Sequence, residues 1–152
     1  MLESWHYYAY ERLALQHPWW VRLLHLRPLA CCRLLFRLAN YAHPRTVGFV
    51  GLLPTERAYI LAAVPSAREV TTLAADLVLV GADHQSEAAA IARQMPPHGM
   101  LIIEGIRHDR HTTALWHALQ DDPQTGITFD LYTYGIVFFD HNRHKQHYII
   151  NF

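Results

Sequence analysis

Polar side chains that could do chemistry follow two strand-like segments of this sequence. Residues 76–81 and 100–104 are short apolar runs typical of buried parallel strands. The loops after them carry a basic and acidic group of side chains: His84, Arg107, His108, Asp109 and His111. Open α/β sheets bind ligands at the carboxyl ends of their strands, and histidine exchanges a proton near neutral pH. The group predicts a small anion or small-molecule site, with an ordinary polar surface as the simpler interpretation.

A second group of histidines recurs every three residues near the end of the sequence, at His141, His144 and His147. Imidazoles are frequent zinc ligands. This spacing nearly aligns side chains on a helix, but these residues lie in a predicted turn, where it does not. We therefore predict no metal site here and expect only adventitious capture of zinc or nickel.

Composition excludes several classes of protein. The chain has 152 residues, 51% of them hydrophobic, which suits one compact domain. Its 13 basic and 13 acidic residues balance, so no net field recruits nucleic acid or an anionic membrane. The adjacent Cys31 and Cys32 do not suggest a disulfide framework. With no apolar run of about 18 residues and no secretory signal, we expect a cytoplasmic protein.

The order of elements indicates an α/β layered domain with a mainly parallel sheet. Helices are predicted within residues 1–43, followed by strands and helices in alternation. Thr55 is the expected N-cap of the first helix after the strand at residues 46–51. The aromatic and β-branched end of the chain alternates in polarity. It predicts an antiparallel hairpin of residues 127–139 and 147–152 around a polar turn at 140–145.

Several stretches resemble small bacterial O-methyltransferases of the class I S-adenosylmethionine (SAM)-dependent fold. They are residues 34–41 (LLFRLANY), 76–84 (DLVLVGADH), 127–132 (ITFDLY), 135–139 (GIVFF) and 145–148 (KQHY). The likeness runs from about Pro28 to the C-terminus. It implies a three-layer Rossmann-like sheet with a C-terminal antiparallel hairpin. The predicted organisation is a single domain, with N-terminal helices at 1–43 and a truncated core at 44–152.

The cofactor-binding turn of that family is altered in this chain. In the family the first strand ends in an acid, two positions before the first glycine of a turn that closely approaches SAM. Phe49 occupies the acidic position, and Gly51 remains as the first glycine. Thr55, after Pro54, takes the place of the second glycine, and proline has no amide to offer. The resemblance leaves Gly51 as the candidate cofactor-binding residue; we expect no cofactor, or SAM if the protein is active.

The metal ligands of the metal-dependent relatives are also incomplete. Those proteins hold a divalent cation with oxygen ligands after the fourth and fifth strands. Gly81 stands at the first of these positions, with Asp83 and His84 close by, and Glu104 and Gly105 represent the pair at the next strand. Asp83, His84, Glu104, Arg107 and His108 are the resulting catalytic candidates, without a predicted metal.

A segment of the family's sheet is missing from the sequence. Residues 70–73 stand where its second strand ends, yet only Ala74 and Ala75 separate them from the stretch that resembles its fourth strand. Parallel neighbours need a crossover of about a dozen residues. We therefore predict a sheet lacking two strands, in which residues 46–51 form an exposed edge and residues 70–73 extend the next strand. An apolar edge needs cover, so we expect a homodimer through this edge or through the N-terminal helices.

Three functions are compatible with these features. The first is a non-catalytic, methyltransferase-like protein with an unknown partner, a pseudoenzyme. The second is a SAM-dependent O-methyltransferase whose pocket is completed by oligomerisation. The third is a small-ligand-binding protein that uses the loops at His84 and Arg107.

Overall fold

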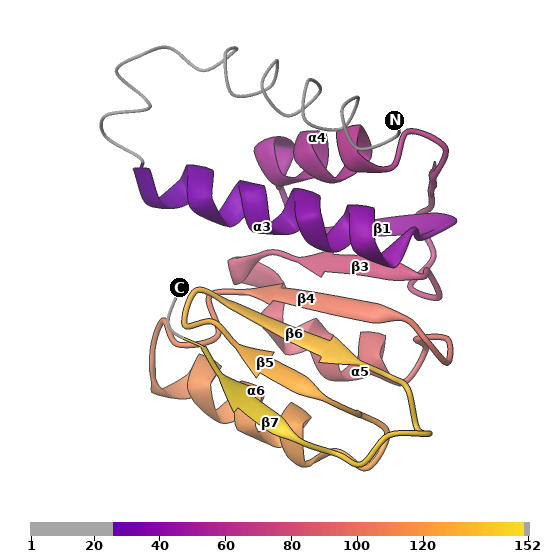
Figure 1. Cartoon of the computed structure of the whole chain (residues 1–152). Coiled ribbons are helices and arrows are strands. Elements are labelled where there is room, and N and C mark those ends of the chain that lie inside the picture. The colour runs from indigo at the N-terminus through magenta and orange to yellow at the C-terminus, as the bar shows by residue number, and fades with distance from the viewer. Residues whose placement is uncertain (1–25, 151–152) are drawn as a thin grey trace. The chain divides into compact units, whose positions relative to one another are not determined.

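The computed structural model describes residues 26–150, which divide into two compact units (Figure 1). The first unit contains helices α3 (Leu26–Ala42) and α4 (Pro54–Ala63), and the second contains the sheet. The helices predicted before residue 26 lie outside the described residues. So do the aromatic residues proposed for a dimer contact there: Trp5, Tyr7, Tyr8, Tyr10, Trp19 and Trp20.

The two helices of the first unit pack against each other. In α3 the side chains of Leu35, Phe36 and Ala39 are buried at helical spacing. The helix α4 begins one residue earlier than expected, because Pro54 takes a first-turn position where its missing N–H costs nothing. Leu53 is its N-cap residue, so the prediction of Thr55 as the cap is wrong.

The second unit holds a seven-stranded sheet in the order β2-β1-β3-β4-β6-β5-β7. Its strands are β1 (Thr46–Val50), β2 (Arg68–Glu69), β3 (Leu77–Val80), β4 (Met100–Glu104), β5 (Thr128–Asp130), β6 (Tyr134–Phe138) and β7 (His147–Ile149). The strands from β2 to β4 are parallel, and β6 runs antiparallel to both β4 and β5. The predicted α/β fold, mainly parallel with an antiparallel hairpin, is confirmed.

The prediction that β1 is a bare edge is wrong at the start of the strand. Thr46 and Val47 pair in parallel with Arg68 and Glu69 of β2, and the Val70 N–H donates to the Val47 carbonyl at 2.9 Å. The sheet thus keeps a short strand in the place that we expected to be empty. Beyond Val47, no strand among the described residues pairs with this side of β1.

Residues 70–76 carry the chain from β2 over β1 to β3 without a crossover helix. A Cβ atom placed on Gly48 would lie 3.6 Å from the Thr72 carbonyl oxygen and 3.7 Å from the Ala75 Cβ, so the link passes close to bare backbone. The expectation of a crossover of about a dozen residues is wrong here, because β2 has only two residues. The link to β3 has to cross a single strand, β1. A reciprocal pair then secures the start of both strands, with the Thr46 N–H on Asp76 Oδ2 at 3.1 Å and the Asp76 N–H on Thr46 Oγ1 at 3.0 Å.

The C-terminal hairpin is built differently from the prediction. Its two strands are β5 and β6, with the turn at residues 131–133, whereas the turn had been expected at 140–145. Residues 139–146 instead lead to β7, which pairs in parallel with β5 on its outer side. The alternating pattern indicates strands but not their partners, and the short turn at Tyr132 requires a left-handed backbone, with φ +65°, that the residue type does not announce.

One face of the sheet is covered by the short helix η1 (Ala82–Glu87), α5 (Ala88–Ala92) and α6 (Arg110–Asp121). The cluster on this face joins Val78, Leu101 and Val137 of the strands to Ile91 and Leu119 of the helices. Burial of each such side chain contributes roughly 1.5–3 kcal/mol. This cluster fixes the strand ends at which the candidate residues lie. Within the described part of the chain, no helix is long and apolar enough to cross a membrane.

The Trp116 ring lies directly over Gly135 of β6. A Cβ on Gly135 would fall 2.6 Å from Cζ3 and 2.7 Å from Cη2 of the indole, whereas a Cβ on Gly48 would meet nothing closer than 3.6 Å. Both glycines are buried strand residues, so substitution of Gly48 is a matched control for substitution of Gly135.

We predict that Gly135→Ala lowers the free energy of unfolding by about 1–3 kcal/mol, because the buried indole must move. Gly48→Ala should change it by less than about 1 kcal/mol in either direction. Urea denaturation of both variants measures this. Equal losses at the two positions would contradict the packing of Trp116 on β6.

Candidate functional site

The predicted site residues lie at the carboxyl ends of β3 and β4 in the second unit. Asp83 and His84 belong to η1, directly after β3, and Glu104 is the last residue of β4. Arg107 and His108 follow in the loop that leads to α6. These two loops touch through specific hydrogen bonds, which determine what each side chain can do.

Glu104 joins the two loops. Its Oε2 accepts a hydrogen bond from the Ala82 N–H at 3.3 Å, and its backbone carbonyl accepts one from Gln85 Nε2 at 2.5 Å. The next residue, Gly105, has φ +74°, and a Cβ there would lie 2.7 Å from Gln85 Nε2. The Glu104 carboxylate therefore holds η1 against the end of β4.

His84 lies against the remnant of the glycine turn. A Cβ on Gly51, whose φ is +102°, would lie 2.8 Å from His84 Cδ2, so the imidazole occupies the space that a side chain at position 51 would take. Its Nδ1 is 2.8 Å from Glu87 Oε1, and both side chains are about half exposed. Such an exposed pair contributes little to stability. The absence of a side chain at Gly51 therefore leaves the space that the His84 ring occupies.

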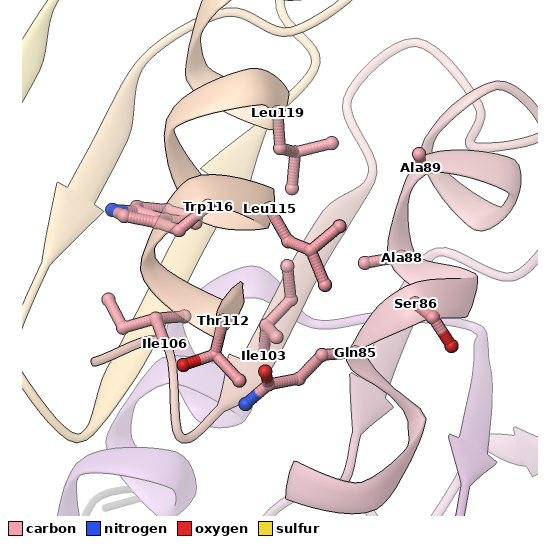
Figure 2. A pocket seen from close by; sticks show the side chains of 10 residues that line it. All are labelled: Gln85, Ser86, Ala88, Ala89, Ile103, Ile106, Thr112, Leu115, Trp116 and Leu119. Atoms are coloured by element: carbon pink, nitrogen blue, oxygen red, sulfur yellow. The ribbon is translucent and has the colours of Figure 1, made fainter. Parts of the chain in front are cut away.

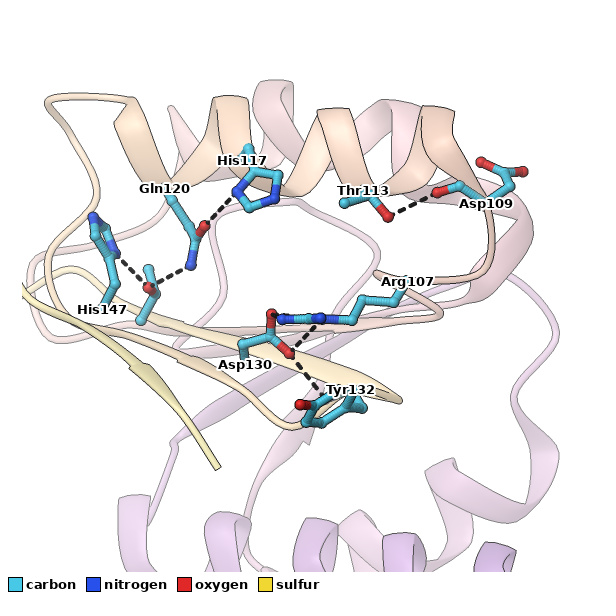
Figure 3. Close-up of polar contacts among 9 residues, drawn as sticks. Arg107, Asp109, Thr113, His117, Gln120, Asp130, Tyr132 and His147 are labelled. Atoms are coloured by element: carbon cyan, nitrogen blue, oxygen red, sulfur yellow. Dashed lines mark hydrogen bonds and ion pairs between the residues drawn. The ribbon is translucent and has the colours of Figure 1, made fainter. Parts of the chain in front are cut away.

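Arg107 forms an ion pair that the sequence analysis missed. Its Nε donates to Asp130 Oδ1 and Oδ2 at 3.1 and 2.9 Å, and its Nη2 donates to Oδ2 at 2.7 Å (Figure 3). The Asp130 carboxylate is only 2% exposed, so this two-pronged contact compensates a buried charge. The hydrogen bond that Arg107 donates to Asp130 raises the pKa of Arg107, against the opposing effect of desolvation.

Tyr132 completes the cluster around Arg107. Its N–H donates to Asp130 Oδ1 at 2.9 Å, and its ring lies 4.4 Å from the guanidinium carbon of Arg107. This contact is a cation–π interaction. A signal was present in the sequence, because Thr128 and Asp130 are polar residues at inward positions of an alternating strand. A carboxylate at such a position requires a cationic partner, which sequence alone did not identify.

Asp109 serves the helix that follows it. Its side chain accepts from the Thr112 N–H at 2.8 Å, and its own N–H donates to Thr112 Oγ1 at 3.0 Å, which forms a capping box at the start of α6. The hydrogen bond from the Thr112 backbone lowers the pKa of this carboxyl group. Asp109 thus has a structural role at the start of α6. His108 and His111 are exposed on the same loop and first turn.

A small cavity lies beneath the loops, on the face covered by helices (Figure 2). Its volume is about 30 Å³, enough for roughly one water molecule and far below the ~300 Å³ of a small-molecule pocket. Ile103, Leu115 and Trp116 are among its lining residues. Gln85 Oε1 and the Trp116 indole nitrogen, on two of the lining residues, are buried without a hydrogen-bond partner among the described residues.

The three C-terminal histidines do not converge. His147 lies on β7, where its Nδ1 is 2.7 Å from Thr128 Oγ1, while His141 and His144 are exposed in the segment before it. Among residues 26–150, no three His, Cys, Asp or Glu side chains gather in a way that could hold a metal ion.

The comparisons with known proteins concern the fold. No protein-family model matches the sequence, and no curated protein matches it. Among solved structures, cofactor-bound Rv0187 from MTB is similar with a TM-score of 0.57 and 13% identity, over 88% of this chain and 87% of that one. The O-methyltransferase from Bacillus cereus, in complex with SAH, aligns with a TM-score of 0.45 and 13% identity, over 91% and 98%.

This chain has a Rossmann-like α/β fold similar to that of Rv0187. At this identity, the likeness to Rv0187 establishes the fold alone. At the carboxyl edge of the sheet, Glu104, Arg107 and Asp109 bond to other groups of the chain, whereas His108 and His111 are exposed. The ion pair between Arg107 and Asp130 is the most buried of these contacts, and it can be tested separately.

We predict that Arg107→Ala lowers the free energy of unfolding by about 1–3 kcal/mol, because the buried Asp130 carboxylate loses its partner. The side chain of Arg107 is 34% exposed, which limits the loss. Arg143→Ala is the control, since Arg143 pairs with Asp140 at 3.6 Å and is 73% exposed; its loss should stay below about 1 kcal/mol. Similar losses in the two variants, measured by chemical denaturation, would refute a structural role for the Arg107 pair.

Proposed function

We propose that this protein is a methyltransferase-like pseudoenzyme, which keeps the fold but neither binds SAM in the family's mode nor transfers a methyl group. The observation that carries this proposal is Phe49, near the end of β1, at the position where the resembling family has an acid. A phenyl ring cannot accept a hydrogen bond as a carboxylate does. Its presence there removes the interaction that usually fixes the cofactor beside the first strand.

The chain after β1 supports the same proposal. Gly51 keeps the left-handed backbone of a glycine turn. The helix that follows begins at Pro54, so its first position offers no N–H to a ligand. Backbone amides at such turns and helix starts are the usual donors to an anionic or polar ligand.

The candidate catalytic residues support the proposal through their contacts. Glu104 accepts from the backbone of η1, and Arg107 is paired with Asp130. Asp109 caps α6. Side chains that already hold their own loops together would have to break these contacts to act on a substrate. We propose that the edge of the sheet has been recruited for stability rather than for chemistry.

Calorimetric titration of the full chain with SAM and with S-adenosylhomocysteine tests the pseudoenzyme proposal. We expect no saturable binding up to about 1 mM, equivalent to less than about 4 kcal/mol of binding free energy. Cooperative unfolding of the same sample controls for its folded state. Stoichiometric binding with a micromolar Kd would overturn the proposal.

The competing function is a SAM-dependent O-methyltransferase whose pocket a second subunit completes. It is favoured by the side of β1 beyond Val47, where no described strand pairs and another chain could bind. In that case SAM would raise the Tm of the protein, because a ligand that binds only the folded state stabilises it. Gly51→Ala would remove this shift, since its Cβ would collide with His84 and strain the turn.

The SAM-dependent shift in Tm, rather than the Tm itself, is the measurement to compare. Gly48→Ala is the matched control, because this glycine lies in the same strand with room for a Cβ. The enzyme function predicts a shift in wild type and Gly48→Ala but none in Gly51→Ala. No shift in any of the three at saturating SAM would exclude it, and the pseudoenzyme proposal expects this result.

A further inference from the structure

The strand β7 is the outer edge of the sheet, opposite the edge at β2. Among the described residues it pairs with β5 alone, through contacts such as the Thr128 N–H on the Gln146 carbonyl at 2.9 Å and the Ile150 N–H on the Asp130 carbonyl at 2.8 Å. Backbone groups alternate in direction along a strand. The N–H and C=O groups of His147 and Ile149 therefore point away from β5.

Side chains hold β7 firmly in this position. The Thr128 hydroxyl lies 2.7 Å from His147 Nδ1 and accepts from Gln120 Nε2 of α6 at 3.3 Å (Figure 3). On the other face, the Tyr148 ring stacks on Phe129 with centroids 5.2 Å apart. The strand is ordered before any partner arrives, so pairing costs little further backbone entropy.

The edge is apolar and lacks the usual protection against pairing. Tyr148, Ile149 and Ile150 are 43%, 64% and 42% exposed. Natural edge strands commonly carry a lysine, a proline or a bulge that prevents association. The nearest lysine is Lys145, but its ammonium turns back and donates to the Asp122 carbonyl and to Thr125 Oγ1. No acidic or lysine side chain of β7 therefore places a charge where it would oppose pairing with another strand.

We propose that β7 pairs antiparallel with β7 of a second copy of this chain, about a two-fold axis through Tyr148. In this register His147 of one copy faces Ile149 of the other, and the reverse. All outward backbone groups of both strands are then paired with each other. The two Tyr148 side chains become direct neighbours, which extends the stack from Phe129 across the axis.

The second copy is favoured over an unrelated strand because the pattern is self-complementary. Under a two-fold axis, when a residue of one copy faces a given residue of the other, the reverse contact forms as well. The register centred on Tyr148 satisfies this without placing like charges opposite each other. An axis through His147 would instead place the two imidazoles opposite each other and leave Ile149 facing Lys145. The axis at Tyr148 is therefore favoured, because it does not place the apolar Ile149 opposite a lysine residue.

The first experiment measures the oligomeric state of the full chain by sedimentation over a range of concentrations. Because a strand of three residues buries less area than a standard interface, we expect a dimer that dissociates on dilution. Ile149→Lys should raise the dimer Kd at least about tenfold, since two ammonium groups would be forced to the interface. Tyr41→Lys is the control, because Tyr41 is an 81% exposed aromatic residue of the first unit.

The outcomes of this experiment separate the possibilities. Weaker association in Ile149→Lys and unchanged association in Tyr41→Lys support the proposal. The proposal is overturned if the protein is a monomer at every concentration up to about 100 µM. This result corresponds to an association free energy weaker than roughly 5 kcal/mol. A dimer that only Tyr41→Lys disrupts overturns it as well and locates the contact in the first unit.

The second experiment tests the register by disulfide formation. In the proposed pairing the two Tyr148 Cα atoms are about 4.5 Å apart, within the range of a disulfide, so Tyr148→Cys should form covalent dimers under mild oxidation. Ile149→Cys should not, because its symmetry mate lies about 8–9 Å away, two residues along the strand. The unsubstituted chain, with Cys31 and Cys32, provides the background. Equal cross-linking of the two variants would refute the Tyr148 axis. Neither experiment requires SAM binding.

Discussion

The passage of the chain over Gly48 is the constraint on which the rest of the sheet depends. Residues 70–76 cross β1 close to its backbone, where a Cβ at Gly48 would lie 3.6 Å from the Thr72 carbonyl oxygen, in ordinary van der Waals contact. The reciprocal hydrogen bonds between Thr46 and Asp76 then align the starts of β1 and β3. This short link lets the two-residue strand β2 pair with the outer side of β1. The relative positions of the Gly51, Gly81 and Gly105 turns follow from it.

The same short link explains why the carboxyl edge of the sheet has the residue types of a catalytic site, although these residues make structural contacts. His84 fills the space over Gly51, and Glu104 fixes η1. Arg107 compensates the charge of Asp130. Each contact is one that a small domain needs, because it has little apolar surface to spare. The fold agrees with that of cofactor-bound Rv0187, while the Phe49 and Pro54 substitutions underlie our proposal that the chemistry has been lost.

The two sides of the sheet differ in how their outer strands are covered. The resemblance in sequence directed attention to β1, yet β2 covers the start of that strand. The unprotected apolar edge is β7, at the other side of the sheet, where the nearest lysine is turned back onto its own chain. The proposed interface therefore lies at the edge opposite the one that the sequence indicated. Either outer strand of an open sheet leaves backbone groups that a partner can pair with.

The sequence by itself determined the element types, because periodicity and apolar runs report burial. It placed β3 and β4 within a residue or two and brought Glu104, Arg107 and His84 to one edge of the sheet. Only the tertiary structure decided the β2 pairing, the parallel addition of β7, and Asp130 as the partner of Arg107. These features depend on contacts between residues far apart in the chain. Local pattern shows that a strand or a buried carboxylate needs a partner, but the partner is chosen by the path of the backbone in space.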